Sequence, residues 1–355
     1  MSDINEQIAF AEKEIRETPY HKGTEHYIGK LRARISRLRD KIYESSSKSS
    51  GGGGGYAVKK QGDATIVLAG PPSAGKSTLI NKLTNAESRV AAYAFTTVSV
   101  VPGMFLYKDA FIQIMDIPGL IEGAKEGKGR SKEVLSVVRS SDLVIIMTDV
   151  DNIEKIDLIE KEFDKSGIRI NKKTPLIKIE KKLSGGIIIH TNVRQNLSRQ
   201  TIEEVIKEFR FINAEVTIKE NLTLEKLIDA LSPSRVYIPA IYCVNKVDLR
   251  KIEKNNKFLY ISAEKGTGLE ELKESIWNTL EFVRVYLIKP DKDPNYDDPI
   301  VMKKGQMLSE VTQKIGIDFS ENKKSAKIWG PGAKFPGQEV SLSIPILEGM
   351  QARFI

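Results

Sequence analysis

One short segment constrains this chain most: an apolar run that leads into a glycine-rich turn and then into a helix pattern. The run occupies residues 64–69, and residues 70–77 (GPPSAGKS) fit the pattern G-x-x-x-x-G-K-[ST]. The pattern has a physical meaning between a strand and a helix, because backbone N–H groups at a helix N-terminus can surround an anion. The segment therefore predicts a phosphate-binding loop in an α/β domain.

Two side chains of this loop have specific expected roles. Lys76 is expected to reach the β- and γ-phosphates of a nucleotide and to act in catalysis, and Ser77 is expected to ligate Mg²⁺. The other residues expected to contact the nucleotide here are Gly70, Pro72, Ser73, Ala74, Gly75 and Thr78.

Further apolar runs predict the sheet to which the loop belongs. Residues 111–115, 143–147, a run around Ile241 and residues 258–261 are expected to be strands, separated by helix patterns. Buried strands that alternate with helices predict a mainly parallel, doubly wound α/β fold.

A candidate metal carboxylate follows the second of these strands. Asp116 and Gly119 form a D-x-x-G pattern about 40 residues after the loop lysine, so Asp116 can hold Mg²⁺ through water and the Gly119 amide can sense a γ-phosphate. Between the two motifs, Thr97 is favoured over Thr96 as the threonine that closes over the metal. Threonines that simply begin a strand are the alternative.

A base-selecting motif follows the run around Ile241. The Asp248 carboxylate can accept hydrogen bonds from both N1–H and the exocyclic amine of guanine, a donor pair that adenine lacks. Asn245 is expected to support the base and the phosphate loop, and the Lys246 stem to cover the purine face. The Ala263 amide is expected to donate to guanine O6, with Ser262 and Glu264 beside it.

The first 45 residues have helical periodicity and a basic face. Lys30, Arg32, Arg34, Arg37, Arg39 and Lys41 occupy the polar side of the second helix pattern. Two interpretations stay open: a solvated helical hairpin, or a surface that docks on RNA. Residues 45–55 (SSSKSSGGGGG) predict a flexible linker.

Composition adds weaker constraints. The net charge of +8 favours polyanionic partners, without proving one. The single cysteine, Cys243, lies in an apolar run and is expected to be buried and reduced, as suits a cytoplasmic protein. No apolar run reaches the roughly 20 residues that span a membrane, and the first residues lack the features of a signal peptide.

Several segments together resemble one family. They are residues 93–97 (YAFTT), 102–103 (PG), 116–124 (DIPGLIEGA) and 127–130 (GKGR), with 24–29 (TEHYIG), 211–216 (FINAEV) and 327–330 (KIWG) outside the nucleotide motifs. Over nearly the whole chain, they resemble the developmentally regulated GTP-binding proteins, in the Obg-like branch of translation-factor-related GTPases.

The resemblance implies an arrangement of domains. The spacing from Lys76 to Asn245 exceeds by about 70 the roughly 100 residues typical of a single-domain GTPase, enough for a small inserted domain. The expected order is a helical region (1–45), a linker (46–60), a GTPase domain (61–167 and 239–282), a small α/β insert (168–238) with a basic stretch, and a β-grasp-like TGS domain (283–355). The lysines of the basic stretch are Lys172, Lys173, Lys178, Lys181 and Lys182.

Departures from better-known GTPases affect the expected chemistry. Leu120 stands where Ras-type enzymes have a water-orienting glutamine, so intrinsic hydrolysis is expected to be slow and open to acceleration by a regulatory partner. Ser73 stands where some relatives that use K⁺ have asparagine, which leaves K⁺ stimulation open. Arg130 is expected on a glycine-rich switch rather than as a catalytic finger.

The leading functional hypothesis is a monomeric, slow GTPase switch that uses Mg²⁺ and acts in translation or ribosome assembly. Its expected partners are guanine nucleotide and, through the basic helices and insert, the ribosome or RNA; no membrane partner is expected. The alternative is a nucleotide-gated protein–protein scaffold with incidental hydrolysis. A synthetase or hydrolase that reuses a TGS module is disfavoured, because the three histidines (His21, His26, His190) have no metal-site spacing.

Overall fold

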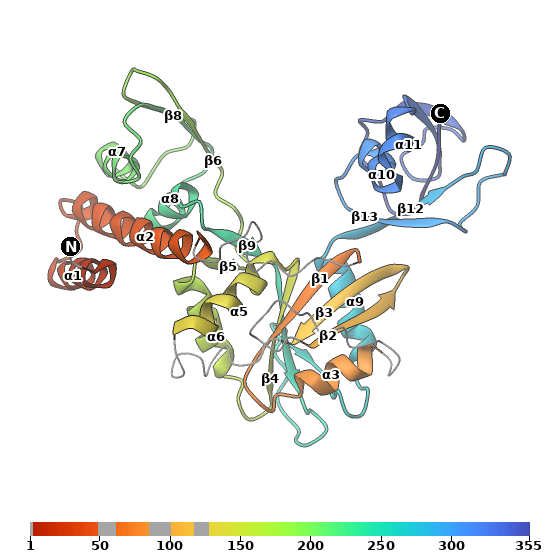
Figure 1. The fold of residues 1–355 in the computed structure, drawn as a ribbon, viewed down its shortest axis with the longest axis horizontal. Helices are drawn as coiled ribbons and strands as arrows, with labels where there is room; N and C mark the ends of the chain where they lie inside the picture. Colours follow the sequence, from red (N-terminus) through yellow and green to blue (C-terminus); the bar gives the residue numbers. More distant parts are fainter. Residues whose placement is uncertain (1–2, 49–61, 85–100, 117–127) are drawn as a thin grey trace. The chain divides into compact units, whose positions relative to one another are not determined.

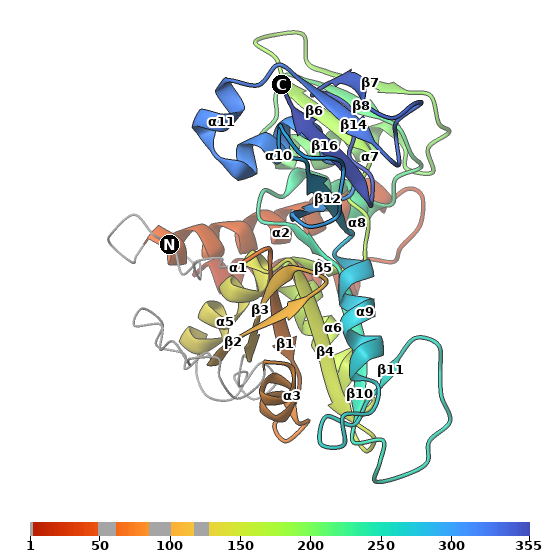
Figure 2. The ribbon, with the colours of Figure 1, turned by 90° about the vertical axis from the view of Figure 1, so that its right-hand side faces the viewer.

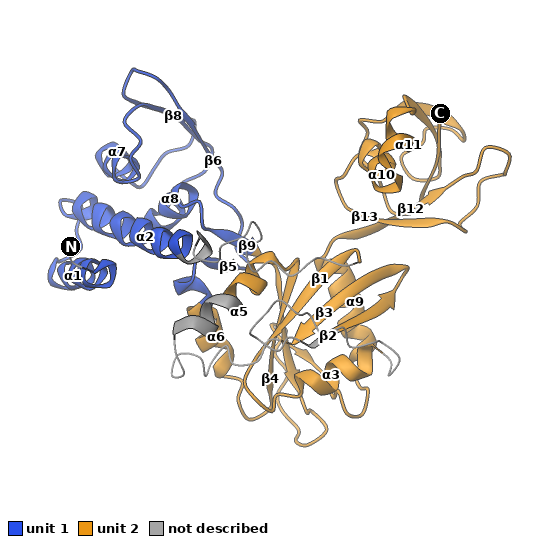
Figure 3. Ribbon diagram, in the orientation of Figure 1, with its two compact units in different colours: residues 1–56, 163–237 blue, residues 57–162, 238–355 orange. Residues whose placement is uncertain are grey.

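The structure is a computed structural model that describes residues 3–48, 62–84, 101–116 and 128–355. The chain divides into two compact units, shown in blue and orange in Figure 3. Unit 1 comprises residues 1–56 and 163–237, and unit 2 comprises residues 57–162 and 238–355. Each unit has its own core, so each is described separately.

Unit 2 contains the sheet predicted from the sequence (Figure 1). Its order is β11-β10-β4-β1-β3-β2, and every neighbouring pair is parallel except β3 with β2. The predicted parallel sheet is therefore confirmed. The strands are β1 (Ala64–Ala69), β2 (Val101–Tyr107), β3 (Ala110–Asp116), β4 (Leu143–Asp149), β10 (Ala240–Asn245) and β11 (Leu259–Tyr260).

Helices cover both faces of this sheet, as Figures 1 and 2 show. Alternate residues of β1 serve the two faces: Ile66 and Leu68 join a core cluster with α3 and α9, whereas Val67 and Ala69 point to the side of α5 and α6. Both faces are buried, which explains the continuous apolar strands. The helices are α3 (Lys76–Leu83), α5 (Lys128–Ser140), α6 (Lys155–Lys165) and α9 (Leu269–Thr279).

The edge strand β2 was not predicted. It pairs antiparallel with β3 through a tight turn at Lys108 and Asp109, whose φ angles are 46° and 68°. Pro102 and Gly103 argue against a strand in the sequence. Both are tolerated here because β2 lies at the edge of the sheet.

The C-terminal part of unit 2 forms a second sheet, in the order β13-β12-β16-β14-β15. The strand predicted at 283–287 is present as β12, and the predicted turn contains Gly330 and Gly332, both at positive φ. Val285, Ile328 and Ala352 from three strands pack with Leu308 and Val311 of α10. The elements are β12 (Phe282–Leu287), β13 (Pro299–Lys303), α10 (Leu308–Ile315), α11 (Ile317–Glu321), β14 (Ser325–Trp329), β15 (Gln338–Ser341) and β16 (Met350–Phe354).

Unit 1 begins with two packed helices, α1 (Ile4–Glu17) and α2 (Glu25–Lys48). Asp3 caps α1 in a capping box with Glu6, and Ala11, Leu31 and Ile35 form a small core between the helices. One prediction needs correction: α2 continues to Lys48, so the first residues of the segment expected to be linker are helical. The rest of that segment lies outside the described residues.

The remainder of unit 1 is a small α/β arrangement. Its three-stranded sheet has the order β6-β8-β7, and β5 pairs with β9. The apolar faces of α7 and α8 cover one side of the three-stranded sheet, with Val205, Ile206 and Leu227 fully buried. The elements are β5 (Ile168–Ile170), β6 (Ile177–Lys181), β7 (Ile187–Thr191), α7 (Arg199–Glu208), β8 (Ala214–Ile218), α8 (Leu224–Leu231) and β9 (Val236–Ile238).

Helix α2 packs directly on α7, so the N-terminal helices and the later part of unit 1 share one core. Ala33 is fully buried within the α7 and α8 cluster. At Gly29 a Cβ atom would lie 3.2 Å from side-chain carbons of Leu224 and Val205, which shows how close the helices approach. Two segments far apart in the sequence therefore form one folding unit.

This packing neutralises much of the basic face of α2. Arg32 pairs with Glu225 of α8 at 2.6 Å, Arg37 with Glu208 of α7 at 2.9 Å, and Arg39 with Glu12 of α1 at 3.0 Å. Lys30, Arg34 and Lys41 are exposed, and they have no ion pair with any residue that the structure describes. Half of the basic residues predicted on this face are thus paired with carboxylates of the same unit.

Two predictions from composition can also be compared with the structure. Cys243 is fully buried in the sheet core, and this burial raises its pKa to about 12, which confirms a buried structural thiol. Over the described ranges, no helix combines the length and apolarity needed to cross a membrane.

Candidate nucleotide-binding site

The glycine-rich loop leaves the carboxyl end of β1 and turns tightly into α3. The turn needs glycine at its start, because a Cβ at Gly70 would lie only 2.0 Å from the carbonyl oxygen of Met147 in β4. Gly75 precedes α3 with φ of 92°, and a Cβ there would lie 2.3 Å from Asn245 Nδ2. The N-cap residue Gly75 has no side chain that could cap α3, so the first N–H groups of the helix can bind an anion.

The loop lysine is buried against the loop itself. Lys76 is 7% exposed, and its Nζ donates to the carbonyl oxygens of Gly70 at 3.2 Å and Pro71 at 3.1 Å. The same ammonium lies 3.8 Å from Asp116 Oδ1 at the end of β3. A positive charge is thus held at the N-terminus of α3, where phosphate oxygens would gather.

Ser77 and Asp116 meet across two elements. The Ser77 hydroxyl donates to Asp116 Oδ2 at 3.0 Å, while Oδ1 is buried and has no hydrogen-bond partner among the described residues. The Lys76 ammonium at 3.8 Å is too far from Oδ1 for a hydrogen bond, so this buried oxygen can still take an interaction from a metal ion or water. The structure therefore brings together the two residues predicted to serve a metal.

Asn245 connects the phosphate loop to the base-selecting segments. Its side chain is 2% exposed; Nδ2 donates to the Ala74 carbonyl at 2.9 Å, and Oδ1 accepts from the Ala263 amide at 2.9 Å. One amide thus fixes two loops that are distant in the sequence. Because the Ala263 N–H is directed at Asn245 here, its expected contact with guanine O6 stays a prediction.

Asp248, the residue predicted to select the base, is exposed and ionised. A hydrogen bond from the Ser262 hydroxyl is the main cause that lowers the pKa of Asp248 below its usual value, despite some desolvation. Because its folded pKa is lowered, this group loses its charge only when the pH falls below the ordinary range for aspartate. The carboxylate is therefore available at neutral pH to accept two hydrogen bonds from a base.

Lys246 has a partner that the sequence analysis missed. Its φ is 63°, and Nζ lies 3.4 Å from Asp149 Oδ2 at the end of β4. Burial acts to raise the pKa of Asp149, but hydrogen bonds from Asn152 and Lys246 outweigh it and lower the pKa. The sequence contained one signal for this contact: Asp149 is a carboxylate at the end of β4, the strand that pairs with β10.

The other predicted residues divide into three groups. Pro72, Ser73 and Glu264 are exposed at the site, and Thr78 is half-buried in α3. Thr96, Thr97, Gly119 and Leu120 lie outside the described residues. Arg130 falls within α5, but its side chain is outside what the structure describes.

Comparisons with known proteins now give the site a context. Residues 65–182 match the family described as 50S ribosome-binding GTPase, and residues 184–282 match the C-terminal region of that domain. A GTP-binding protein of Methanocaldococcus jannaschii is 44% identical, with 98% of this chain and 91% of the relative covered. Developmentally-regulated G-protein 3 of Arabidopsis thaliana is 38% identical, with 96% of this chain and 95% of the relative covered.

The human developmentally-regulated GTP-binding protein 2 is 36% identical, and the match covers 96% of both chains. The chain belongs to the family of developmentally regulated GTP-binding proteins. This membership confirms the resemblance drawn from the sequence. As a member of the family, the chain is a guanine-nucleotide-binding protein of the P-loop GTPase class. The part that Asn245 and Asp248 play in guanine recognition stays a prediction.

Proposed function

We propose that this chain binds GTP with Mg²⁺, hydrolyses it slowly to GDP and phosphate, and acts as a switch on RNA or the ribosome. The proposal that this chain binds GTP rests mainly on two hydrogen bonds of the Asn245 side chain. One joins it to Ala74 in the phosphate loop, and the other joins it to Ala263 beside the base motif. In our proposal this side chain links phosphate recognition to base recognition. Lys76 and the N-terminus of α3 supply the positive potential for the phosphates.

The residues present fit Mg²⁺. The ion prefers oxygen ligands, and the Ser77 hydroxyl and Asp116 carboxylate lie 3.0 Å apart, while Asp116 Oδ1 accepts no hydrogen bond from the described residues and has only the Lys76 ammonium at 3.8 Å. In our proposal Ser77 ligates the ion and Asp116 holds it through water, with Thr97 as the third predicted group. When bound, Mg²⁺ neutralises charge on the β- and γ-phosphate oxygens.

We expect Ser77→Ala to weaken Mg²⁺ binding in the nucleotide complex by about 10- to 100-fold, because one oxygen ligand is lost. The measurement is the dissociation rate of a fluorescent GDP analogue as the Mg²⁺ concentration is varied. Asp116→Asn should act in the same direction, whereas Asp291→Asn, which removes an exposed carboxylate in the loop after β12, should not. An unchanged Mg²⁺ dependence in Ser77→Ala would contradict the assignment.

Hydrolysis is expected to be slow. Leu120 has no group that could orient water, and the predicted switch residues Thr97 and Gly119 must supply the closure around the γ-phosphate. The decisive experiment measures GTP turnover by the purified chain with Mg²⁺, in K⁺ or Na⁺, with and without ribosomes. Stimulation by K⁺ would place a cation near Ser73. Tight GTP binding with no turnover under any condition would favour a nucleotide-gated scaffold.

Two observations support the RNA or ribosome part. The matching family is described as ribosome-binding, and Lys30, Arg34 and Lys41 form an exposed stripe on α2. They recur at spacings of four and seven residues, which places them on one side of the helix. Since the other three arginines are used in ion pairs, this stripe is the part of α2 that can meet phosphates.

We expect Lys30→Glu combined with Arg34→Glu to reduce co-sedimentation with ribosomes by at least about tenfold at low salt, because phosphate contacts are replaced by repulsion. Lys161→Glu with Lys251→Glu is the matched control, since it makes the same charge change at exposed lysines of unit 2. If both double variants lost co-sedimentation equally, the effect would be one of net charge alone. If the Lys30 and Arg34 variant lost none, the stripe on α2 would be excluded as the ribosome contact.

The C-terminal residues 283–355 are the remaining predicted RNA-related element. Their mixed five-stranded sheet with α10 packed on it has the elements of a β-grasp-like module, which supports the TGS assignment. The small α/β insert expected at 168–238 is likewise supported by its own sheet. A cytoplasmic location and a monomeric state complete the proposal.

A further inference from the structure

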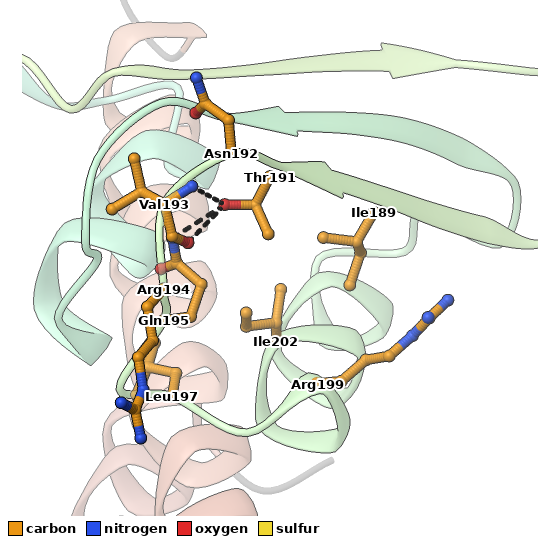
Figure 4. Close-up of a pocket in the computed structure, with 9 residues that line it drawn as sticks. All are labelled: Ile189, Thr191, Asn192, Val193, Arg194, Gln195, Leu197, Arg199 and Ile202. Carbon is orange, nitrogen blue, oxygen red and sulfur yellow. Dashed lines mark hydrogen bonds between the residues drawn. The ribbon is translucent and has the colours of Figure 1, made fainter.

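Unit 1 contains a groove that the nucleotide chemistry does not use. It has a volume of about 460 Å³ and lies between strand β7 and helix α7 (Figure 4). Ile189 from β7 and Ile202 from α7 point into it from opposite sides. A second hollow of about 480 Å³ shares Ile189, Thr191 and Asn192 with it, and Lys219 after β8 is also among its lining residues.

Strand β7 forms one wall of the groove and is an edge strand. It pairs with β8 on one side only, and no other strand of the described chain pairs with its outer edge. The Ala214 amide of β8 donates to the Gly186 carbonyl. This bond shows which residues of β7 direct their backbone groups toward β8, because such residues alternate along a strand. The backbone groups of Ile188 and His190 then point to β8, and those of Ile187, Ile189 and Thr191 point outward.

The groove has an apolar floor and a cationic rim. Ile189, Leu197 and Ile202 supply the floor. Arg194 and Arg199 lie on opposite sides of the hollow in Figure 4. Arg199 pairs with Glu203 at 2.9 Å, whereas Arg194 is exposed and has no ion pair with any part of the chain that the structure describes.

We propose that this groove binds an extended segment of a partner protein, in which apolar residues alternate with acidic ones, by adding it as a strand to β7. The outward N–H and C=O groups of β7 would pair with the peptide backbone. The apolar side chains of one peptide face would enter the floor beside Ile189 and Ile202, because strand side chains alternate in direction. Acidic residues would meet Arg194 and, at the end of the groove, Lys219.

A protein segment fits this groove better than RNA does. The lining residues include no Phe, Tyr or Trp ring on which a base could stack, and the single imidazole, of His190, lies 3.3 Å from the Glu215 carboxylate, which would repel a phosphate. A sugar–phosphate backbone lacks the alternating N–H and C=O groups that could pair with the free edge of β7. It is also polar and gains little from contact with the apolar floor. The combination of free strand edge, apolar floor and cationic rim is instead that of strand addition.

The test uses the full chain and fluorescein-labelled hexapeptides in which Asp or Glu alternates with Val, Ile or Leu. Fluorescence polarisation should show binding that Arg194→Glu weakens at least about threefold, because a rim attraction becomes repulsion. Lys173→Glu, the same charge change at an exposed lysine outside the groove, should leave binding unchanged. Asp248→Asn should also bind the peptide normally, since the groove lies wholly in unit 1.

Two further measurements separate strand addition from simple charge attraction. Peptides with N-methyl groups on alternate residues should bind at least about tenfold more weakly, because they lose the donors of one strand edge. Hydrogen exchange should slow at the Ile189 and Thr191 amides when the unmodified peptide binds. Equal binding of the N-methylated peptides would overturn the proposal, as would no binding by any hexapeptide. Binding of a uridine hexanucleotide with the same Arg194 dependence, in place of the peptides, would make the groove an RNA site.

Discussion

The Asp248→Asn variant is expected to bind GTP about 10²- to 10⁴-fold more weakly than the parent chain. Asp248 can accept two hydrogen bonds from guanine, and hydrogen bonds to a charged group contribute about 1.5–3 kcal/mol each. The asparagine side chain keeps one acceptor, its carbonyl oxygen. Its NH₂ group would face the second donor of guanine, and two donors repel each other. The pKa of Asp248 is lowered by the Ser262 hydroxyl, so the full effect should be present at neutral pH. Calorimetric titration with GDP and GTP measures it.

The same variant should bind xanthosine triphosphate better than the parent does. Xanthine presents N1–H and a carbonyl at C2, which match the acceptor and the donor of asparagine. Glu253→Gln is the matched control, because it removes an exposed carboxylate at a residue with no assigned contact to the base. The thermal transition of Asp248→Asn should be unchanged without nucleotide, since the side chain is exposed. A loss of GTP binding below tenfold would contradict the role of Asp248.

The parts of the fold that the sequence predicted are those with a strong local signal. Strand β1 was predicted with its observed bounds, because a six-residue buried run ends at a glycine-rich turn. The ends of β1, β3 and β10 carry Gly70, Asp116 and Asn245, and parallel strands bring their carboxyl ends to one edge. Local pattern and sheet topology together therefore predicted where the site would form.

Features that depend on contacts between distant segments were not predicted. Strand β2 contains Pro102, and only its position at the sheet edge makes a strand there acceptable. The basic face of α2 was visible in the sequence, but its partners Glu208 and Glu225 lie in α7 and α8, far along the chain. Charge periodicity identifies a face without showing what packs against it.

Within the site, the sequence predicted residue types better than their contacts. Asn245 was expected beside the phosphate loop, and its hydrogen bond to Ala74 confirms that. Its second bond, to Ala263, and the pairing of Lys246 with Asp149 were not foreseen. Such contacts depend on backbone details such as the positive φ of Lys246, for which a short motif provides no signal.

Replacement of Asn245 by alanine is the second large effect that we expect. The change leaves the Ala74 carbonyl and the Ala263 amide without a partner in a buried place, at about 1–3 kcal/mol each. The free energy of unfolding of the nucleotide-binding domain should fall by about 2–5 kcal/mol, even without nucleotide. Urea unfolding can be followed by the fluorescence of Trp277, which lies in that core, in a Trp329→Phe background.

Gly75→Ala provides the decisive comparison, because its Cβ would lie 2.3 Å from Asn245 Nδ2 and would displace the same side chain. Both single changes therefore break one hydrogen bond to Ala74, and their combination should cost about 1–3 kcal/mol less than the sum of the two. Gly75→Ala combined with Val285→Ala, in the separate C-terminal core, should be additive. Additivity in the Gly75 and Asn245 pair would mean that Asn245 does not hold the phosphate loop, and that phosphate and base recognition are separate in this site.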